Sequence, residues 1–137
     1  LRGGEIEIEE SVENSQLVDA TVFDLFKAYQ KILDSKSFKK DYEIEITEMS
    51  VTDRIQYILD ILNSSDSVTF ESLFTILNSK QEIIVTFLAI LELMRIKLLR
   101  VQQGQHFETI RIYKSADQET QDAILQEYHR NLDDGSP

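Results

Sequence analysis

The two histidines, His106 and His129, are the side chains best suited to acid–base catalysis or metal binding in this chain. The chain has no cysteine, and neither histidine forms a recognisable ligand set with spaced carboxylates. A serine–histidine–acid triad cannot be defended either, because one histidine falls in an expected turn and the other in a terminal segment. We therefore expect both to be solvated, and we expect no catalytic residue, cofactor or metal site.

Acidic residues are the other chemical feature, and they are densest near the N-terminus. The cluster consists of Glu5, Glu7, Glu9, Glu10 and Glu13. Its alternating spacing lacks the aspartate-rich loop and turn glycine of a calcium-binding EF-hand, although the alternation of glutamate with isoleucine allows an induced strand. The four glycines of the chain form no phosphate-binding loop, so any ATPase activity would belong to a partner. The sequence predicts a protein that is not an enzyme.

The overall charge argues against nucleic acid as the partner. The 137 residues include 25 acidic and 14 basic ones, giving a formal net charge of −11. This charge repels phosphate unless a basic face is segregated, and the sequence shows no such face. The absence of cysteine fits a reducing cytoplasm, no apolar run could span a bilayer, and no signal peptide is visible. We expect one cytoplasmic domain with tails, and a start at Leu1 suggests a piece of a longer protein.

The elements that would position a site begin after residues 1–18, which we assign to an acidic linker or tail. Residues 19–34 place apolar side chains at helical spacing, which predicts an amphipathic helix with one buried face. That face consists of Val22, Leu25, Phe26, Tyr29, Ile32 and Leu33. Residues 42–46 alternate between apolar and acidic side chains, which predicts a short strand. Residues 19–47 are thus expected to be a helix and a strand that lead into the main domain.

Three helices are expected next. The first has a capping pair beginning at Ser50 and is followed by a polar loop over residues 63–67. The second is short and is capped by Thr69. The third begins at Ser79, which is spaced to form a capping box with Glu82.

The third helix is the most informative segment because it is almost wholly apolar. At about 100° per residue, four side chains fall within one sector and are expected to fill the core. They are Ile83, Phe87, Ile90 and Met94. Ile84 and Leu88 lie to one side with Leu91 on the border, while a narrow polar stripe includes Thr86. The third helix is therefore expected to be buried on two sides. Either a helix of the same chain or a partner protein could cover the second side, which holds Ile84 and Leu88.

A hairpin follows the third helix. Residues 99–103 alternate between apolar and polar side chains, Gly104 marks a turn, and residues 107–113 alternate again. A third helix that runs into a hairpin is typical of a winged-helix domain, which we assign to residues 48–114. Residues 115–137 are expected to form a C-terminal helix or a flexible tail. The predicted fold class is mainly α with a small β-hairpin (α+β), as a winged-helix domain preceded by an amphipathic helix.

The run from Val85 to Leu93, followed by Gln103 and by Phe107 to Ile112, carries a family resemblance. It is similar to the carboxy-terminal part of the segregation and condensation protein A family, the bacterial kleisins. In that family the hairpin commonly has an aromatic-Gly-Asp-Ile step, whereas this chain has Phe107-Glu108-Thr109-Ile110 and lacks the glycine and the aspartate. The resemblance extends over residues 23–114.

The resemblance implies a non-enzymatic subunit of a bacterial SMC complex, which organises and segregates chromosomes. In that family the carboxy-terminal winged helix docks on the ATPase head of one SMC subunit, and the amino-terminal domain binds the neck of the other. The central segment recruits a dimer of segregation and condensation protein B. This chain would keep the head-binding end and an incomplete part of that linker, as a cytoplasmic, nucleoid-associated protein.

The expected contact surface for the SMC head is the third helix and the adjoining hairpin. Its candidate residues are Ile84, Phe87, Leu88, Leu91, Leu99, Val101, Phe107 and Ile110. Within this set Leu88 lies off the core sector of the helix, whereas Phe87 faces it, so we expect the two residues to differ in role.

An alternative function is that of a winged-helix transcription regulator that binds DNA. A DNA-reading helix needs polar side chains aimed at base edges, and the third helix offers aliphatic and aromatic ones instead. The alternative would also require the basic residues of this region to gather on one face. They are Lys80, Arg95, Lys97, Arg100 and Arg111. A third class, a small hydrolase, has no constellation of residues to support it, and we expect neither specific nucleic-acid binding nor membrane association.

Overall fold

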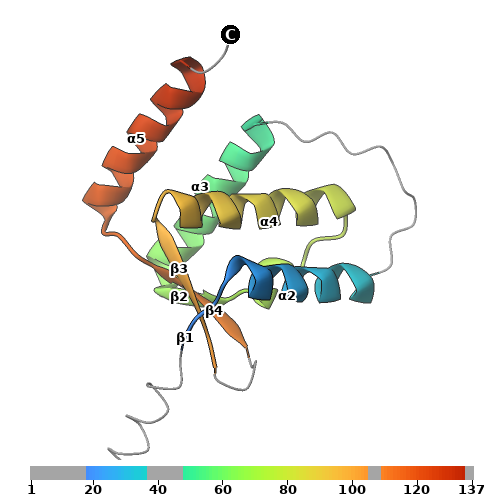
Figure 1. Ribbon diagram of the computed structural model, residues 1–137. Coiled ribbons are helices and arrows are strands. Elements are labelled where there is room, and N and C mark those ends of the chain that lie inside the picture. Colours follow the sequence, from blue (N-terminus) through green and yellow to red (C-terminus); the bar gives the residue numbers. More distant parts are fainter. Residues whose placement is uncertain (1–17, 37–47, 105–108, 135–137) are drawn as a thin grey trace, which may run out of the picture.

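A computed structural model describes residues 18–36, 48–104 and 109–134 of the chain (Figure 1). The elements in chain order are β1 (Val18–Asp19), α2 (Val22–Ser35), α3 (Glu48–Ser65), β2 (Ser67–Thr69), the 3₁₀ helix η1 (Glu71–Leu73), α4 (Lys80–Arg95), β3 (Leu99–Gln103), β4 (Ile110–Lys114) and α5 (Gln118–Asp134). Helices therefore predominate over a small sheet, which confirms the predicted fold class. None of the helices within these ranges is long and apolar enough to cross a membrane.

The sheet is antiparallel, with strand order β1-β3-β4-β2. The predicted hairpin is confirmed as β3 and β4, in which Val101 pairs with Ile112. From α3 to β4 the chain runs helix, strand, helix, helix, strand, strand, and β4 lies between β2 and β3. The assignment of this segment to a winged-helix domain stays a prediction. β1 and β2 are two and three residues long, and neither was predicted, because so few residues show no alternation.

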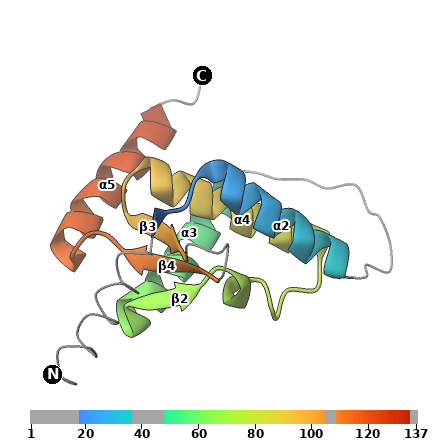
Figure 2. The same cartoon turned by 60° about the horizontal axis from the view of Figure 1, so that its bottom comes forward.

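Both views show the helices α2 and α4 lying side by side, and α4 also packs against α3, which crosses it (Figures 1 and 2). The inward side chains of β3 and β4, together with those of α3 and α4, form one apolar core. Its fully buried members include Ile58, Leu59, Ile83, Ile90 and Ile112. Met94, which we predicted to lie in the core, is half-buried at its margin.

The first helix of the domain differs from its prediction at both ends. α3 begins at Glu48, so Ser50 lies inside the helix and the predicted cap at this residue is wrong. The predicted loop over residues 63–67 is also wrong, because α3 continues to Ser65. It ends where Asp66 takes a left-handed conformation, with φ of 63°, and donates its backbone N–H to the carbonyl of Leu62 at 3.1 Å.

The second helix is shorter than predicted. Only η1 forms, although the Thr69 hydroxyl accepts a hydrogen bond from the backbone N–H of Ser72 at 3.2 Å, as a capping residue does. The apolar side chains of this segment are nevertheless all buried, namely Phe70, Leu73, Phe74 and Leu77. One helical turn followed by further turns is enough to bury them.

The predicted start of α4 is confirmed, and the structure has one half of the predicted capping box: the Ser79 hydroxyl accepts from the backbone N–H of Glu82 at 3.0 Å. The end of α4 is a Schellman turn: Leu98 N–H donates to the carbonyl of Leu93 at 2.9 Å and Lys97 N–H to that of Met94 at 3.1 Å. This turn requires a left-handed residue, and Lys97 supplies it with φ of 63°. The turn aims the chain directly into β3.

The C-terminal segment forms a helix, which was one of the two predicted alternatives. The Asp117 carboxylate accepts from the backbone N–H of Thr120 at 2.8 Å at the start of α5, and this hydrogen bond lowers the pKa of Asp117. Gln121 is 1% exposed and exchanges two amide hydrogen bonds with Asn63 on α3, at 3.2 and 3.1 Å. Leu125 completes the attachment as the buried apolar residue of the helix.

Several predictions made from the sequence lie outside the described residues. They concern the strand over residues 42–46, the glutamate cluster near the N-terminus, His106 and Phe107. The division of the chain into residues 1–18, 19–47, 48–114 and 115–137 also stays a prediction.

Lys97→Gly is expected to raise the free energy of unfolding by about 1 kcal/mol, because glycine takes the left-handed conformation without the clash between Cβ and the backbone. Urea denaturation monitored by circular dichroism measures the change. Lys80→Gly serves as the control, since Lys80 is the first residue of α4 and glycine there is expected to destabilise the helix. A loss of stability in Lys97→Gly would contradict the role given to this turn.

Candidate partner-binding surface

Aromatic packing joins α2 to α4 and decides which side of α4 remains open. The ring of Tyr29 stacks on Phe87 with centroids 4.2 Å apart and planes at 10°. Phe26 lies 6.3 Å from Phe87, and Phe70 meets it edge-on at 6.4 Å. Phe87 is thus surrounded by three other rings, and burial in this cluster raises the pKa of the Tyr29 phenol.

α4 is buried on a side that the sequence predicted to be polar, whereas the predicted second apolar side, with Ile84 and Leu88, is not fully covered by the described residues. Thr86 is 1% exposed and Ala89 is fully buried, so the expected polar stripe along this side is wrong. We attribute their burial to α3, which packs against α4. The Thr86 hydroxyl donates to the carbonyl of Glu82 at 2.7 Å, which satisfies its hydrogen-bonding group inside the core.

What remains open on α4 is the sector that holds Ile84, Leu88 and Leu91. Leu88 is 37% exposed, and the other two are half-buried. Spacings of three and four residues place all three on one side of the helix. Next to them Arg95 donates to Glu92 at 2.6 Å in an ion pair that raises the pKa of the guanidinium. This sector is an apolar strip with a charged border.

α2, which packs beside α4, also carries exposed apolar side chains. Val22 is 55% exposed, Phe23 66% and Phe26 42%. The sequence predicted Val22 and Phe26 to be buried, which is wrong, because α4 covers only part of the wide apolar arc of α2. Among the described residues, four of the six large exposed apolar side chains lie on these two helices. We call the set Val22, Phe23, Phe26, Ile84, Leu88 and Leu91 the α2–α4 surface.

The other residues of the predicted contact surface lie elsewhere. Leu99, Val101 and Ile110 are 3, 3 and 7% exposed and point into the core, and Phe87 is 7% exposed. In this structure these four residues offer little surface to a partner. Phe107 lies outside the described residues. Sequence reasoning missed Val22, Phe23 and Phe26 as surface residues, although the unusual width of the apolar arc of α2 was a visible signal.

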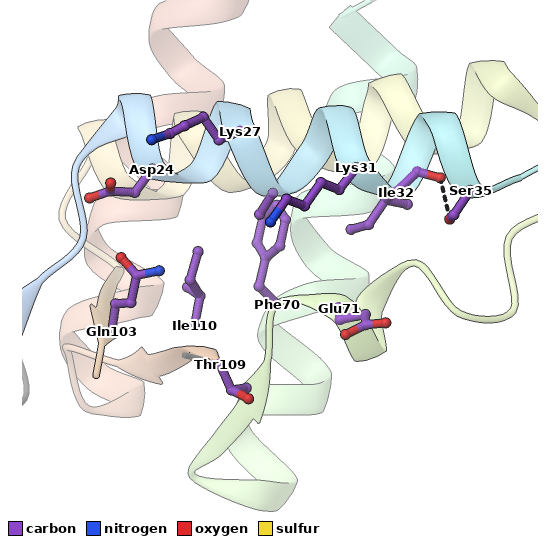
Figure 3. Close-up of a pocket in the computed structure, with 11 residues that line it drawn as sticks. Asp24, Lys27, Lys31, Ile32, Ser35, Phe70, Glu71, Gln103, Thr109 and Ile110 are labelled. Carbon is purple, nitrogen blue, oxygen red and sulfur yellow. Dashed lines mark hydrogen bonds between the residues drawn. The ribbon is translucent and has the colours of Figure 1, made fainter. Parts of the chain in front are cut away.

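A groove of about 680 Å³ lies between α2 and the hairpin (Figure 3). Phe70, Ile32 and Ile110 provide apolar lining. The charged lining residues are two lysines and two acids, Lys27, Lys31, Asp24 and Glu71, so their formal charges cancel. The Asp24 carboxylate is also engaged in capping α2, where it accepts from the backbone N–H of Thr21 at 2.9 Å. The groove therefore offers both apolar and charged surface to a bound side chain. Its lining contains no histidine or cysteine.

The side chains that could act in catalysis or metal binding do not cluster within the described residues. His129 is exposed on α5 with its ring 5.8 Å from that of Tyr128. Within the part of the chain that the structure describes, no group of three or more histidine, cysteine or acidic side chains is placed to hold a metal ion. The described surface therefore offers apolar contact area rather than a cluster of reactive side chains.

Comparison with known proteins gives a consistent result. Residues 6–115 match the family model described as "Segregation and condensation protein ScpA". Segregation and condensation protein A of Bacillus licheniformis is 36% identical over 102 residues, which are 72% of this chain and 40% of that protein.

Two further relatives carry the same name. The protein of Clostridium tetani is 28% identical over 120 residues, covering 83% of this chain and 47% of its own length. The protein of Bacillus subtilis is 33% identical over 103 residues, covering 73% of this chain and 41% of its own length. This chain thus spans between 40 and 47% of the length of the three curated relatives.

Phe87→Ala is expected to lower the free energy of unfolding by roughly 3 to 5 kcal/mol, because it removes the ring on which the aromatic cluster is built. Phe23→Ala is the matched control, since Phe23 is exposed, and its effect should stay within about 0.5 kcal/mol. Chemical denaturation of both variants tests the contrast. Equal effects of the two substitutions would mean that the cluster does not hold α2 on α4.

Proposed function

Because this chain belongs to the segregation and condensation protein A family, we propose that it acts as a non-enzymatic kleisin part within a bacterial SMC complex. The proposed role is to dock on the ATPase head of an SMC subunit during chromosome segregation and condensation. ATP hydrolysis would belong to the head, so the role requires no catalytic residue here.

The observation that carries the proposal is the α2–α4 surface. Large apolar side chains of two packed helices are exposed there on a strongly acidic chain, and a group of exposed apolar side chains is a mark of protein contact. Of the residues predicted to meet the head, Ile84, Leu88 and Leu91 offer surface for direct contact. Phe87, Leu99, Val101 and Ile110 would act by supporting that surface from the core.

Two further features of the proposal rest on the family alone. The first is recruitment of a segregation and condensation protein B dimer through the linker, which is incomplete in this chain. The second is a cytoplasmic, nucleoid-associated location. Since this chain spans less than half of its relatives' length, a bridge between two SMC subunits would need segments beyond it.

The alternative of a DNA-binding regulator is less well supported. Lys80 lies at the N-terminal end of α4, whereas Arg100 and Arg111 lie on the hairpin at the other end of that helix. Arg95 is paired with Glu92. The exposed sector of α4 holds aliphatic side chains, which lack the hydrogen-bonding groups that read base edges.

The chain is expected not to bind duplex DNA with sequence selectivity at physiological salt, because its net charge of −11 opposes phosphate. Fluorescence anisotropy with labelled duplexes and unlabelled competitor measures this. Selective binding that survives the competitor would favour the regulator.

Leu88→Glu is expected to leave the melting temperature nearly unchanged and to abolish association with an SMC head, since loss of an interface anchor typically costs about 2 kcal/mol or more. Phe87→Ala should lower both stability and association. Ile76→Glu is the matched control, because Ile76 is 71% exposed and lies outside the α2–α4 surface. Calorimetric titration of the head with each variant makes the comparison. Normal binding by Leu88→Glu would remove this surface from the docking site.

A further inference from the structure

Phe23 is the most exposed phenylalanine or tyrosine in the part of the chain that the structure describes, at 66%. α2 buries three of its residues, Leu25, Tyr29 and Ile32. At about 100° per residue, Phe23 lies roughly 120 to 180° around the helix from each of them. No adjustment of α2 on this core would therefore bury the ring, and cover for it must come from outside the core.

The backbone that carries Phe23 is held on both sides of the residue. Thr21 and Asp24 form a complete capping box, in which the Asp24 carboxylate accepts from the backbone N–H of Thr21 at 2.9 Å. The Thr21 hydroxyl accepts in turn from the backbone N–H of Asp24 at 3.2 Å. Leu25, two residues beyond Phe23, is fully buried. Because the position of the ring is fixed in advance, its binding to a partner would cost little conformational entropy.

One face of the Phe23 ring already has a neighbour. The ammonium of Lys27 lies over it, 4.9 Å from the ring centroid, in a cation–π contact that orients the ring. The opposite face and the edge of the ring remain for contact with another molecule. A matching site is therefore an apolar pocket that accepts this edge and face.

The ring stands at the outer edge of the α2–α4 surface. Val22 is 55% exposed and Phe26 42%, and helical spacing places both of them between Phe23 and Tyr29 around α2. Tyr29 stacks on Phe87 of α4, so this is the side of α2 that faces α4. A partner that docks on the α2–α4 surface would therefore meet the ring as well.

The charge of the chain restricts what can cover the ring. A net charge of −11 opposes the approach of a second copy of the chain and of an anionic membrane surface. Nucleic acid is opposed for the same reason. A folded protein partner remains, and an exposed, fixed aromatic ring that enters a partner's pocket is typical of the residues that dominate binding energy in protein interfaces.

We propose that Phe23 is the aromatic anchor of the docking site and that it inserts into an apolar pocket on the SMC head. This inference rests on the proposed docking function. It adds that the main contact comes from α2, which precedes the predicted winged-helix segment of residues 48–114. Ile84, Leu88 and Leu91 on α4 would then surround the anchor and exclude water from it.

Calorimetric titration of the SMC head with the whole chain tests the anchor. Phe23→Ala is expected to weaken association about 30-fold, which corresponds to the loss of about 2 kcal/mol. The heat capacity change of binding should become less negative, since less apolar surface is buried. The melting temperature should stay unchanged because the ring is exposed. Phe23→Leu keeps part of the apolar side chain and should lose less affinity than Phe23→Ala.

Ile76→Ala is the matched control, because Ile76 is 71% exposed and lies outside the α2–α4 surface. It should bind the head like the parent chain. Parental affinity in Phe23→Ala, together with loss of binding in Leu88→Glu, would overturn the anchor and leave the docking proposal standing. Absence of binding by the parent chain itself would overturn both.

Fluorescence identifies the occupant. The chain has no tryptophan, so Phe23→Trp places a single reporter at the proposed anchor. Its emission is expected to shift to shorter wavelength when the SMC head is added, after subtraction of the same mixture made with the parent chain. A comparable shift on raising the concentration of the chain alone, or on adding vesicles of anionic phospholipid, would overturn the proposal, since the ring would then be covered by a second copy or by lipid.

Discussion

The stacking of Tyr29 on Phe87 is the contact on which the surfaces of this domain depend. α4 is apolar on more sides than a sheet and one helix can cover, and this contact brings α2 onto the side that would otherwise face water. Because α2 covers Phe87 but not Leu88, one residue becomes part of the core and its neighbour part of the surface. Exposure of the α2–α4 surface is thus a consequence of where a single pair of rings meets.

The elements with strong periodicity could be predicted from the sequence. α2, α4 and the hairpin each repeat their apolar residues often enough to identify the type of element. β1 and β2 could not be predicted, because strands of two and three residues exist only through pairing with the hairpin. The loop expected near Ser64 is helical, since its serines and asparagine favour a turn only weakly and the left-handed residue that ends α3 is Asp66.

The candidate site was predictable as a region but not as a set of residues. Helical spacing separated Phe87 from Leu88 correctly, but it could not show how far α2 would reach along α4. In β3 the alternation divided the strand into two faces, and the apolar face was chosen for the partner although a sheet normally turns that face inward.

The amide pair between Asn63 and Gln121 has a consequence for how the molecule opens. Sliding α5 along α3 by a fraction of a turn would break both amide hydrogen bonds at once and separate the buried Gln121 amide from the half-buried Asn63. Intermediate positions of α5 are therefore unfavourable, and α5 is either fully docked on α3 or detached from it. With Leu125 as its buried apolar anchor, α5 would behave as a separate cooperative unit that can detach while the core of α3, α4 and the sheet stays folded.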